Sequence, residues 1–432
     1  MTALDVGFDV PAAVGMTVPE IQTPALVVDL DAFERNVERM RAFTEATGMR
    51  LRAHAKTHKS ADIGLLQMAR GGACGVCCQK VSEAEALVRS GITDVLVSNE
   101  VVGAARIARL AALAGKARVL VCVDDAQNAR DLSAACEAVG TTLEVLVEID
   151  CGSGRCGVHP GPAAVSLARV VSELPGLTFA GLQAYHGAAQ HIPAPAARRA
   201  ATEEAVRLTK LTVDQLREAG FECDIVGGGG TGSHAVEAGS GVYNELQCGS
   251  YVFMDRDYGR IPASAKSDAA VGGFEHALFV LSTVMSAPTA GRRVCDAGLK
   301  ASSVDSGLPG VWAGPEAAGS AAGPSAEHAS VEYEAASDEH GTLSDPEGCL
   351  ALGDHVWLIP GHCDPTVNLY DWYVGVRGLG TTAESESGTG AGAGTGTGAA
   401  GKGGDGGSGS GEMGAEARVE CLWPVTARGK LY

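Results

Sequence analysis

Basic residues are scarce in this chain of 432 residues, in which Lys and Arg number 33 against 52 Asp and Glu. The resulting formal net charge of −19 opposes binding to phosphate backbones and to anionic lipid surfaces. No uninterrupted apolar run approaches the roughly 18 residues that a membrane-spanning helix needs. The first 16 residues contain two Asp and no Lys or Arg, which is not the composition of a secretory signal. We therefore expect a cytoplasmic protein that binds neither nucleic acid nor membrane.

A disulfide framework is not indicated either. The 13 cysteines are an odd number spread among hydrophobic segments of a long chain, which favours reduced thiols. Glycine is abundant instead, and 16 of the 59 glycines fall between Gly378 and Gly414. Such a tract has too few apolar residues to fold on its own. We predict disordered insertions at residues 380–414 and, in a weaker form rich in Ala, Gly and Pro, at residues 313–326.

Short apolar runs alternate with helix-length amphipathic segments over the first two-thirds of the chain. Eight strands separated by helices over roughly 250 residues are typical of a (β/α)8 barrel. A doubly wound open sheet is the alternative. The predicted strands are residues 51–55, 75–79, 94–98, 118–123, 143–149, 179–185, 223–226 and 245–249.

From about residue 272 the chain becomes rich in turns and in short alternating runs, which predicts a C-terminal antiparallel β domain. The whole chain then divides into an N-terminal arm (1–23), a barrel (24–268) and a β domain (269–432), with strand 24–29 joined to the β domain. The strands predicted for the β domain are 279–284, 293–295, 355–359, 372–376 and 418–423.

Polar side chains follow the predicted barrel strands, where barrel enzymes place their catalytic groups. The first strand runs into His54-Ala-Lys56-Thr-His58-Lys59. A lysine at the end of a buried strand is costly to bury as a cation, but it is tolerated where it carries a carbonyl cofactor covalently. Lys56 is the candidate and Lys59 is its alternative. A basic surface turn is the other interpretation.

Two Gly-rich turns follow the seventh and eighth predicted strands, at residues 227–233 and 249–251. Barrel phosphate sites are commonly built from these two loops, where the main chain presents N–H groups to an anion. A phosphate site opposite a lysine on the first strand suggests pyridoxal phosphate. A tight loop without a ligand would also explain the glycines.

The fifth and sixth predicted strands add further candidates. Arg155 follows a Gly-rich turn and could reach the cofactor ring, or form a salt bridge with Asp150 or Glu148. The sixth strand ends at Tyr185 and is followed by two histidines at positions 186 and 191. Histidine titrates near neutral pH, so either could act as a general base, and either could be structural.

The most distinctive stretch of the β domain is Pro360-Gly-His362-Cys-Asp364-Pro365. In an extended segment residues i and i+2 face the same way, so His362 and Asp364 could share a metal ion while Cys363 points away. Imidazole plus carboxylate favours Mg²⁺, Mn²⁺ or Co²⁺ over Zn²⁺. A chance pairing of the two residues is the alternative.

Taken together, these segments resemble the D-threonine aldolase and D-serine dehydratase family of fold-type III pyridoxal-phosphate enzymes, which are relatives of alanine racemase. The resemblance covers nearly the whole chain outside the two predicted insertions. It implies that Lys56 holds the cofactor and that His362 and Asp364 bind a divalent metal. The stretches that carry it are residues 20–24, 54–59, 75–85, 227–233, 243–250, 361–365, 371–377 and 423–430. The implied cofactor contacts, with those suggested above, are Lys56, Gln79, Arg155, Tyr185, Thr231, Gly232, Gly249, Ser250 and Tyr251.

Within this family the dehydratases carry His-x-Cys with zinc and the aldolases His-x-Asp with a harder ion, so Asp364 implies an aldolase. The favoured reaction is reversible cleavage of 3-hydroxy-D-aspartate to glycine and glyoxylate, with His191 as the base and His186 as its alternative. D-Threonine cleavage and dehydration of D-serine or 3-hydroxyaspartate are the alternative reactions, and a non-enzymatic cofactor carrier is disfavoured by the added β domain. The relatives also imply a homodimer. The arginines that could bind the second carboxylate of the substrate are Arg155, Arg256, Arg260 and Arg377.

Overall fold

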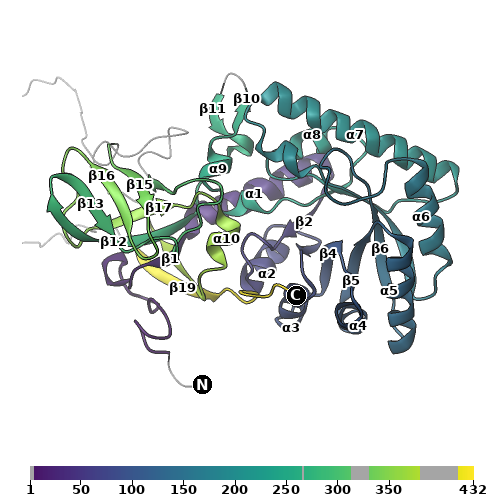
Figure 1. Cartoon of the computed structure of the whole chain (residues 1–432), viewed down its shortest axis with the longest axis horizontal. Coiled ribbons are helices and arrows are strands. Elements are labelled where there is room, and N and C mark those ends of the chain that lie inside the picture. Colours follow the sequence, from purple (N-terminus) through teal and green to yellow (C-terminus); the bar gives the residue numbers. More distant parts are fainter. Residues whose placement is uncertain (1–3, 265–266, 313–329, 380–416) are drawn as a thin grey trace, which may run out of the picture.

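The computed structural model describes residues 4–264, 267–312, 330–379 and 417–432. They form a barrel of alternating strands and helices beside a separate β sheet (Figure 1). The insertions predicted at residues 313–326 and 380–414 lie outside the described residues. No helix among the described residues is both long enough and apolar enough to cross a membrane.

The barrel consists of eight parallel strands that close on themselves, so the predicted (β/α)8 barrel is confirmed. Each strand pairs with its neighbour in sequence, and the last strand pairs with the first. The barrel strands are β2 (Arg50–His54), β3 (Gly75–Cys78), β4 (Asp94–Glu100), β5 (Arg118–Val123), β6 (Leu143–Glu148), β7 (Leu177–Ala184), β8 (Ile225–Gly228) and β9 (Glu245–Leu246).

Side-chain alternation along the strands separates two apolar layers. In β5, Val119, Val121 and Val123 pack outward against the surrounding helices. Leu120 and Cys122 of the same strand point inward, where they meet residues of β3, β4, β6, β7 and β8 in a small central cluster. The barrel is therefore filled by side chains, and only its rims are free to hold ligands.

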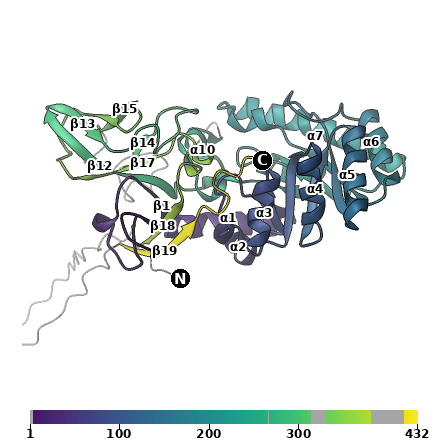
Figure 2. The same cartoon turned by 60° about the horizontal axis from the view of Figure 1, so that its bottom comes forward.

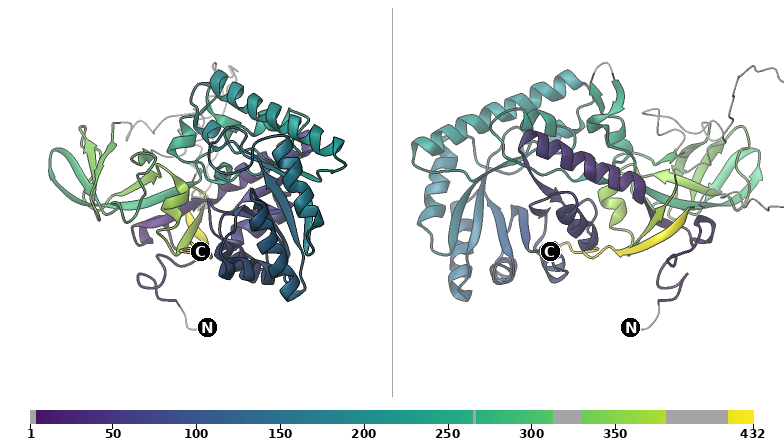
Figure 3. Two further views of the ribbon diagram at one scale, coloured as in Figure 1. Left: turned by 45° about the vertical axis from the view of Figure 1, so that its right-hand side comes forward. Right: turned by 180° about the vertical axis from the view of Figure 1, so that it is seen from behind.

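Helices cover the outside of the barrel, and α1 runs from the β sheet toward it (Figure 3). The α-helices are α1 (Leu30–Thr47), α2 (Ala61–Ala69), α3 (Val81–Arg89), α4 (Ala104–Leu113), α5 (Ala126–Val139), α6 (Pro162–Glu173), α7 (Pro195–Glu218), α8 (His234–Ala238), α9 (Arg256–Gly259) and α10 (Cys363–Val367). The short 3₁₀ helices are η1 (Val18–Glu20), η2 (Gly187–His191), η3 (Ser250–Val252) and η4 (Val271–Gly273).

The second body is a nine-stranded sheet in which one interior strand, β1, comes from the N-terminal part of the chain. β1 pairs antiparallel with β12 and parallel with β18, so the predicted antiparallel domain is correct apart from this pair. The sequence did not predict β14, β15 or β16, nor the separate hairpin of β10 (Pro262–Ser264) and β11 (Ser267–Ala270). The strands of the sheet are β1 (Ala25–Asp29), β12 (Leu278–Thr289), β13 (Gly291–Cys295), β14 (Gly310–Trp312), β15 (Glu332–Ala336), β16 (Gly341–Asp345), β17 (His355–Ile359), β18 (Trp372–Arg377) and β19 (Arg418–Pro424).

The two bodies are joined by hydrogen bonds at the rim formed by the C-terminal ends of the barrel strands. Asp255, at the start of α9, accepts a hydrogen bond from the N–H of Cys363 in α10 (3.0 Å). After β19 the chain returns to the barrel (Figure 2), where Ala427 N donates to the carbonyl of Lys59 at 2.8 Å. The turn that follows β2 therefore rests on the other body, which brings Lys56 close to the segment containing Asp364.

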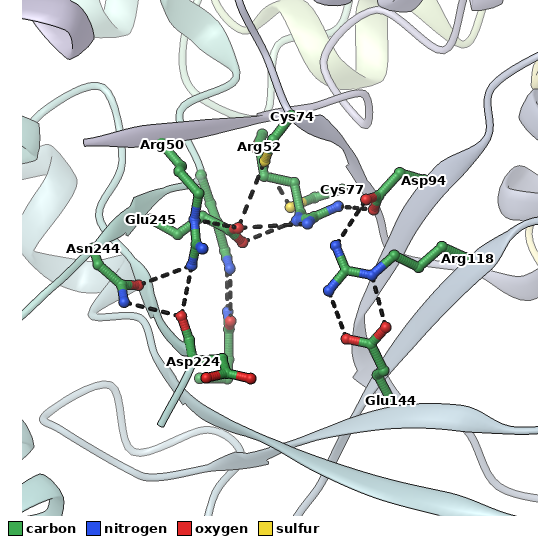
Figure 4. A network of polar contacts seen from close by, with 12 residues as sticks. Arg50, Arg52, Cys74, Cys77, Asp94, Arg118, Glu144, Asp224, Asn244 and Glu245 are labelled. Carbon is green, nitrogen blue, oxygen red and sulfur yellow. Dashed lines mark hydrogen bonds and ion pairs between the residues drawn. The ribbon is translucent and has the colours of Figure 1, made fainter. Parts of the chain in front are cut away.

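The opposite rim, at the N-terminal ends of the strands, is closed by a network of ion pairs (Figure 4). Arg52 and Glu245, each 1 % exposed, pair at 2.9 Å between Nε and Oε1. Arg52 also pairs with Asp94, which in turn accepts from Arg118 at 2.9 Å. Arg118 also pairs with Glu144 at 2.6 Å. Every charged group of this network therefore faces an opposite charge.

Candidate active site

Lys56 follows β2 and faces the β domain. Its Nζ lies 3.0 Å from Asp364 Oδ2. Burial raises the pKa of the Asp364 carboxyl, but Lys56 and His362 outweigh this and hold the pKa at about 2. The alternative, Lys59, is buried in an ion pair with Glu83, so its ammonium is already committed. Lys56 is thus the lysine of this turn that faces the second body.

The two predicted metal ligands come together, although not in the predicted backbone conformation. The segment is not a continuous extended strand: His362 precedes α10 and Asp364 lies in its first turn. His362 Nε2 is nevertheless 3.9 Å from Asp364 Oδ2. This separation is less than twice a metal–ligand bond of about 2.1 Å, so one ion can contact both atoms.

The surroundings of the pair also fit a hard divalent ion. Asp364 Oδ1 is buried and makes no hydrogen bond to the described residues. Cys363 points away, as predicted, with its thiol donating to the carbonyl of Met254 at 3.2 Å. The available donor set is therefore imidazole and carboxylate without thiolate, which suits Mg²⁺, Mn²⁺ or Co²⁺.

Gln79 reaches the same rim of the barrel through His54. The Gln79 side-chain nitrogen lies 3.0 Å from His54 Nε2, and Ser98 Oγ lies 3.2 Å from the same ring atom. Burial, together with the charge of Lys56, lowers the pKa of His54 to about 3. A neutral imidazole between Lys56 and Gln79 therefore forms part of the floor of the site.

The glycines of the loop after β8 are required by Gln190, a fully buried residue of η2. A Cβ atom at Gly232 would lie 2.4 Å from the Gln190 carbonyl oxygen, and one at Gly230 would lie 2.5 Å from Gln190 Oε1. Gly232 N–H donates to that same Oε1 at 3.0 Å. It is therefore Gln190, a residue of the same chain, whose close approach requires glycine at these two positions.

Thr231 is the residue of this loop that is free to meet a ligand. It is 1 % exposed, and its Oγ1 has no hydrogen-bond partner among the described residues. An unpaired buried hydroxyl costs about 1–3 kcal/mol, so such a group fits a ligand oxygen. After the neighbouring strand β9, a Cβ at Gly249 would lie 2.7 Å from Thr57 Oγ1, so Ser250 follows a turn that only glycine fits. This donor and this tight turn fit a phosphate group.

Tyr251 is the cofactor candidate whose side chain points elsewhere. It is fully buried, and its hydroxyl accepts a hydrogen bond from Gln67 Nε2 at 2.9 Å. Gln67 in turn pairs with His58, Oε1 to Nε2, at 3.1 Å. Only the main chain of Tyr251 is left to contact a cofactor. Its side chain joins the loop after β9 to the turn that carries Lys56.

Arg155 and Tyr185 lie together beside the site. The Arg155 guanidinium carbon is 5.9 Å from the centre of the Tyr185 ring, and Arg155 Nη2 is 3.9 Å from Glu148 Oε1. Burial and the carboxylate of Glu100 raise the pKa of Glu148 to about 8. The contact with Glu148 is one of the two roles predicted for Arg155, and the guanidinium also lies over the Tyr185 ring.

The two candidate histidines are placed differently. His191 Nδ1 lies 2.6 Å from Asp257 Oδ2, and its ring is 5.2 Å from that of Tyr258. Both partners lie in α9, which is bonded to α10 through Asp255. His186 turns toward the loop after β6, where its Nδ1 lies 3.5 Å from Ser153 Oγ. His191 is therefore linked through α9 to the segment that holds His362 and Asp364, whereas the contact of His186 with Ser153 runs to the loop after β6.

Among the arginines proposed for the second substrate carboxylate, two are engaged elsewhere. Arg377 pairs with Asp31, Glu34 and Glu420. Arg256 donates to the carbonyls of Leu308 and Pro309.

Sequence reasoning missed three residues of the site: Gln190, Asp257 and Asp305. Asp305 Oδ2 lies 2.8 Å from His362 Nδ1. Both aspartates are more than 50 residues from the histidines they contact, so no spacing rule joins them. Gln190 stands next to His191, but its contacts run to a loop that starts after another strand. Only the fold brings these side chains together.

Two family models match the chain. The model described as "Alanine racemase, N-terminal domain" matches residues 28–257. The model described as "Putative serine dehydratase domain" matches residues 277–376. The first match spans the whole barrel, and the second spans the part of the sheet that holds His362 and Asp364.

Relatives match over nearly the full length. A 3-hydroxy-D-aspartate aldolase of Paracoccus denitrificans (strain Pd 1222) is 47% identical, with 99% of this chain and 97% of the relative covered. A D-threonine aldolase of an Arthrobacter species is 44% identical, with 85% of this chain and 92% of the relative covered. The crystal structure of D-threonine aldolase from Filomicrobium marinum superposes with a TM-score of 0.83 and 44% identity, with 98% and 100% of the two chains covered.

Proposed function

Because the chain belongs to the D-threonine aldolase and D-serine dehydratase family of fold-type III pyridoxal-phosphate enzymes, we propose that it cleaves 3-hydroxy-D-aspartate reversibly to glycine and glyoxylate, with pyridoxal phosphate and a divalent metal. The relatives at high identity over the full chain are aldolases, so the chain is a lyase. The relatives establish the class of enzyme, and we propose its substrate and its dependence on a metal ion.

One observation carries it: Asp364 lies between His362 and Lys56, with Oδ2 at 3.9 and 3.0 Å from the respective nitrogens. A carboxylate in this place gives a hard metal site directly beside the lysine that would hold the cofactor. A hard ion beside the reacting carbon suits polarisation of a β-hydroxyl, and thus aldol cleavage.

The bound groups would supply two elements of the chemistry: pyridoxal phosphate withdraws electrons from the Cα of the amino acid, and the metal ion lowers the pKa of the β-hydroxyl. Lys56 would hold the cofactor covalently. Thr231, with the turns at Gly232 and at Gly249-Ser250, would hold the phosphate.

His191 would take the proton from the β-hydroxyl oxygen. Its Nδ1 faces Asp257, so its Nε2 is the nitrogen free to accept a proton. As that proton leaves, the Cα–Cβ bond breaks and the β carbon leaves as the aldehyde of glyoxylate. Cα then takes up a proton, which gives glycine.

Product analysis tests the proposal. The purified enzyme, supplied with pyridoxal phosphate and Mg²⁺ or Mn²⁺, is given D-3-hydroxyaspartate and D-threonine in parallel. Glyoxylate with glycine, formed faster than acetaldehyde from D-threonine, is the expected result. Faster acetaldehyde formation would make the protein a D-threonine aldolase, and release of ammonia with a keto acid would make it a dehydratase.

Metal dependence is tested separately. Chelation is expected to stop turnover while the cofactor absorbance stays, and Mg²⁺, Mn²⁺ or Co²⁺ should restore the rate. Asp364→Cys should shift metal preference toward Zn²⁺. Full activity of Asp364→Ala in chelator-treated buffer would contradict the metal site.

The proposal also includes a homodimer located in the cytoplasm, with an arm at residues 1–23, a barrel at 24–268 and a β domain at 269–432 that includes strand 24–29. Light scattering on the purified protein tests the oligomeric state.

A further inference from the structure

Each of the two histidines of the site has its Nδ1 atom next to an aspartate carboxylate. Neither aspartate belongs to a motif that the sequence analysis identified. Asp257 Oδ2 lies 2.6 Å from His191 Nδ1, and Asp305 Oδ2 lies 2.8 Å from His362 Nδ1. We propose that Asp257 is the positioning residue of the base His191 and that Asp305 is the positioning residue of the metal ligand His362. This inference rests on the proposed function for His191, while the part on His362 concerns metal binding alone.

Asp257 is held rigidly enough to orient a ring. It lies in α9, where Asp255 accepts a hydrogen bond from Tyr258 N at 2.9 Å and another from Cys363 N. Arg256 N donates to the carbonyl of Pro360 at 2.9 Å. Both contacts to residues 360–363 tie α9 to the segment that holds His362 and Asp364, so this short helix links that segment to His191.

His191 needs such a partner because its side chain is 46% exposed. An exposed imidazole can rotate and can carry its proton on either nitrogen. With Nδ1–H donating to Asp257, the lone pair is on Nε2 and the ring plane is fixed. The Tyr258 ring at 5.2 Å supports one side of it. Asp257 would thus raise the fraction of molecules in which the base is correctly oriented.

Asp305 is fixed in turn by its own loop. Ser303 Oγ donates to Asp305 Oδ1 at 2.8 Å, while Oδ2 meets His362 Nδ1 and accepts a longer hydrogen bond from Ser306 Oγ at 3.5 Å. With Nδ1–H of His362 donating to Asp305, Nε2 is directed toward Asp364. A carboxylate on the second nitrogen of a metal-binding histidine fixes its tautomer and increases its basicity. Loss of such partners typically costs roughly 10–100-fold in metal affinity.

The two aspartates make matched controls for one another, because each contacts one histidine at nearly the same distance. The variants are Asp257→Asn and Asp305→Asn, prepared as holoenzymes with pyridoxal phosphate. Three quantities are measured on each: kcat and KM for cleavage, the Kd for Mn²⁺ by electron paramagnetic resonance, and the absorbance of the bound cofactor. Circular dichroism and a thermal transition report folding.

We expect each of the two substitutions to change one measured quantity and to leave the other nearly unchanged. Asp257→Asn should lower kcat by about 10²-fold or more, with KM and the Mn²⁺ Kd within about twofold of the wild type. Asp305→Asn should raise the Mn²⁺ Kd by about 10–100-fold, with kcat close to that of the wild type once Mn²⁺ is saturating. Asp257→Glu should regain part of the lost kcat, since it keeps the carboxylate.

Other outcomes overturn the inference. An unchanged kcat in Asp257→Asn would remove the role for His191, and an unchanged Mn²⁺ Kd in Asp305→Asn would remove the role for His362. Equal losses of kcat and Mn²⁺ affinity in both variants would indicate a general disturbance of the structure. If the wild type cleaves neither D-3-hydroxyaspartate nor D-threonine, the proposed function fails and the role of Asp257 with it, while the Mn²⁺ measurement still decides on Asp305.

Discussion

At the N-terminal ends of the barrel strands, Arg52 and Glu245 are each 1 % exposed and bind one another directly. At the carboxyl ends of the same strands, Thr231 Oγ1 and Asp364 Oδ1 are equally hidden from water, yet neither has a hydrogen-bond partner among the described residues. One rim therefore satisfies its buried polar groups from within the chain. The other rim leaves some of them unsatisfied.

This difference separates stability from function within one barrel. A buried charge that has lost its partner is costly, so the network of the N-terminal rim acts on the folding equilibrium. Unpaired polar atoms at the rim formed by the C-terminal strand ends destabilise the free protein. A ligand that forms hydrogen bonds with them removes this cost. Substitutions at one rim should thus change the free energy of unfolding, and substitutions at the other should change catalysis.

Lys56→Ala gives the largest expected effect. Cleavage should fall by at least about 10³-fold, because no other amine of the turn is free to carry the cofactor. The variant should lack the visible absorbance of the bound cofactor, and borohydride should no longer fix the cofactor to the chain. Its thermal transition should stay cooperative. If borohydride still fixes the cofactor, Lys59 or another lysine carries it.

Glu245→Gln, at the rim formed by the N-terminal strand ends, should lower stability and leave catalysis unchanged. It removes the main partner of the buried Arg52, so the free energy of unfolding should fall by about 3 kcal/mol in urea denaturation. The kcat of the folded variant should match that of the wild type. Glu203→Gln is the control, because its pair with Arg199 is exposed and should contribute less than about 0.5 kcal/mol. Equal effects of the two substitutions would show that burial of the network does not matter.

Gly232→Ala tests the assignment of the loop glycines to Gln190. The added methyl group would meet the Gln190 carbonyl, so we expect a loss of about 1–3 kcal/mol together with weaker cofactor binding. Gly115→Ala is the control, because its nearest contacts would be at an ordinary 3.5 Å. Cofactor affinity is measured by absorbance titration of the apoenzyme. A normal cofactor affinity in Gly232→Ala would show that the loop can move away from η2.

Glu237→Gln should give the smallest effect, and one that depends on pH. Glu237 lies under the Gly-rich loop and accepts from Ser233 Oγ at 2.7 Å, and burial raises its pKa to about 7. Unlike Glu245, it forms no ion pair with any residue that the structure describes. The folded state therefore holds its proton more tightly, so its contribution to stability is fully present below about pH 4.5 and is lost as the pH rises through 7.

The neutral amide removes this dependence. Glu237→Gln should be more stable than the wild type at pH 8, and the difference should shrink toward zero at pH 4.5. Urea denaturation at both pH values measures it. A difference that is the same at both pH values would show that Glu237 does not titrate in this range.

The sequence predicted the barrel well because its strands are short apolar runs set between amphipathic helices, and that alternation allows few folds. It did less well in the second body. β15 exposes Glu332 and Glu334, and Leu343 is the one large apolar side chain of β16, so both strands lack the apolar pattern that identifies a strand. β16 pairs with β13 on one side and with β15 on the other, and these strands meet only after the chain has folded.

For the site, the sequence predicted the residues that lie at strand ends or within short motifs, such as Lys56 and His362. It gave the wrong local conformation for His362 and Asp364, because a single turn of helix and an extended segment can present the same two side chains together. Partners that come from distant loops, such as Asp257 and Asp305, had no signal of their own in the chain.

The place of β1 has a consequence for the ribosome-bound chain. This strand is made early, but its partner β12 begins at Leu278 and its other partner, β18, begins at Trp372. At about 5–20 residues per second, translation from the end of β1 to the start of β12 takes roughly 12–50 s. During that time the barrel strands emerge and can close into a barrel. The apolar strand β1 meanwhile has no partner at either edge. β1 therefore stays without either neighbour until more than half of the chain has been made.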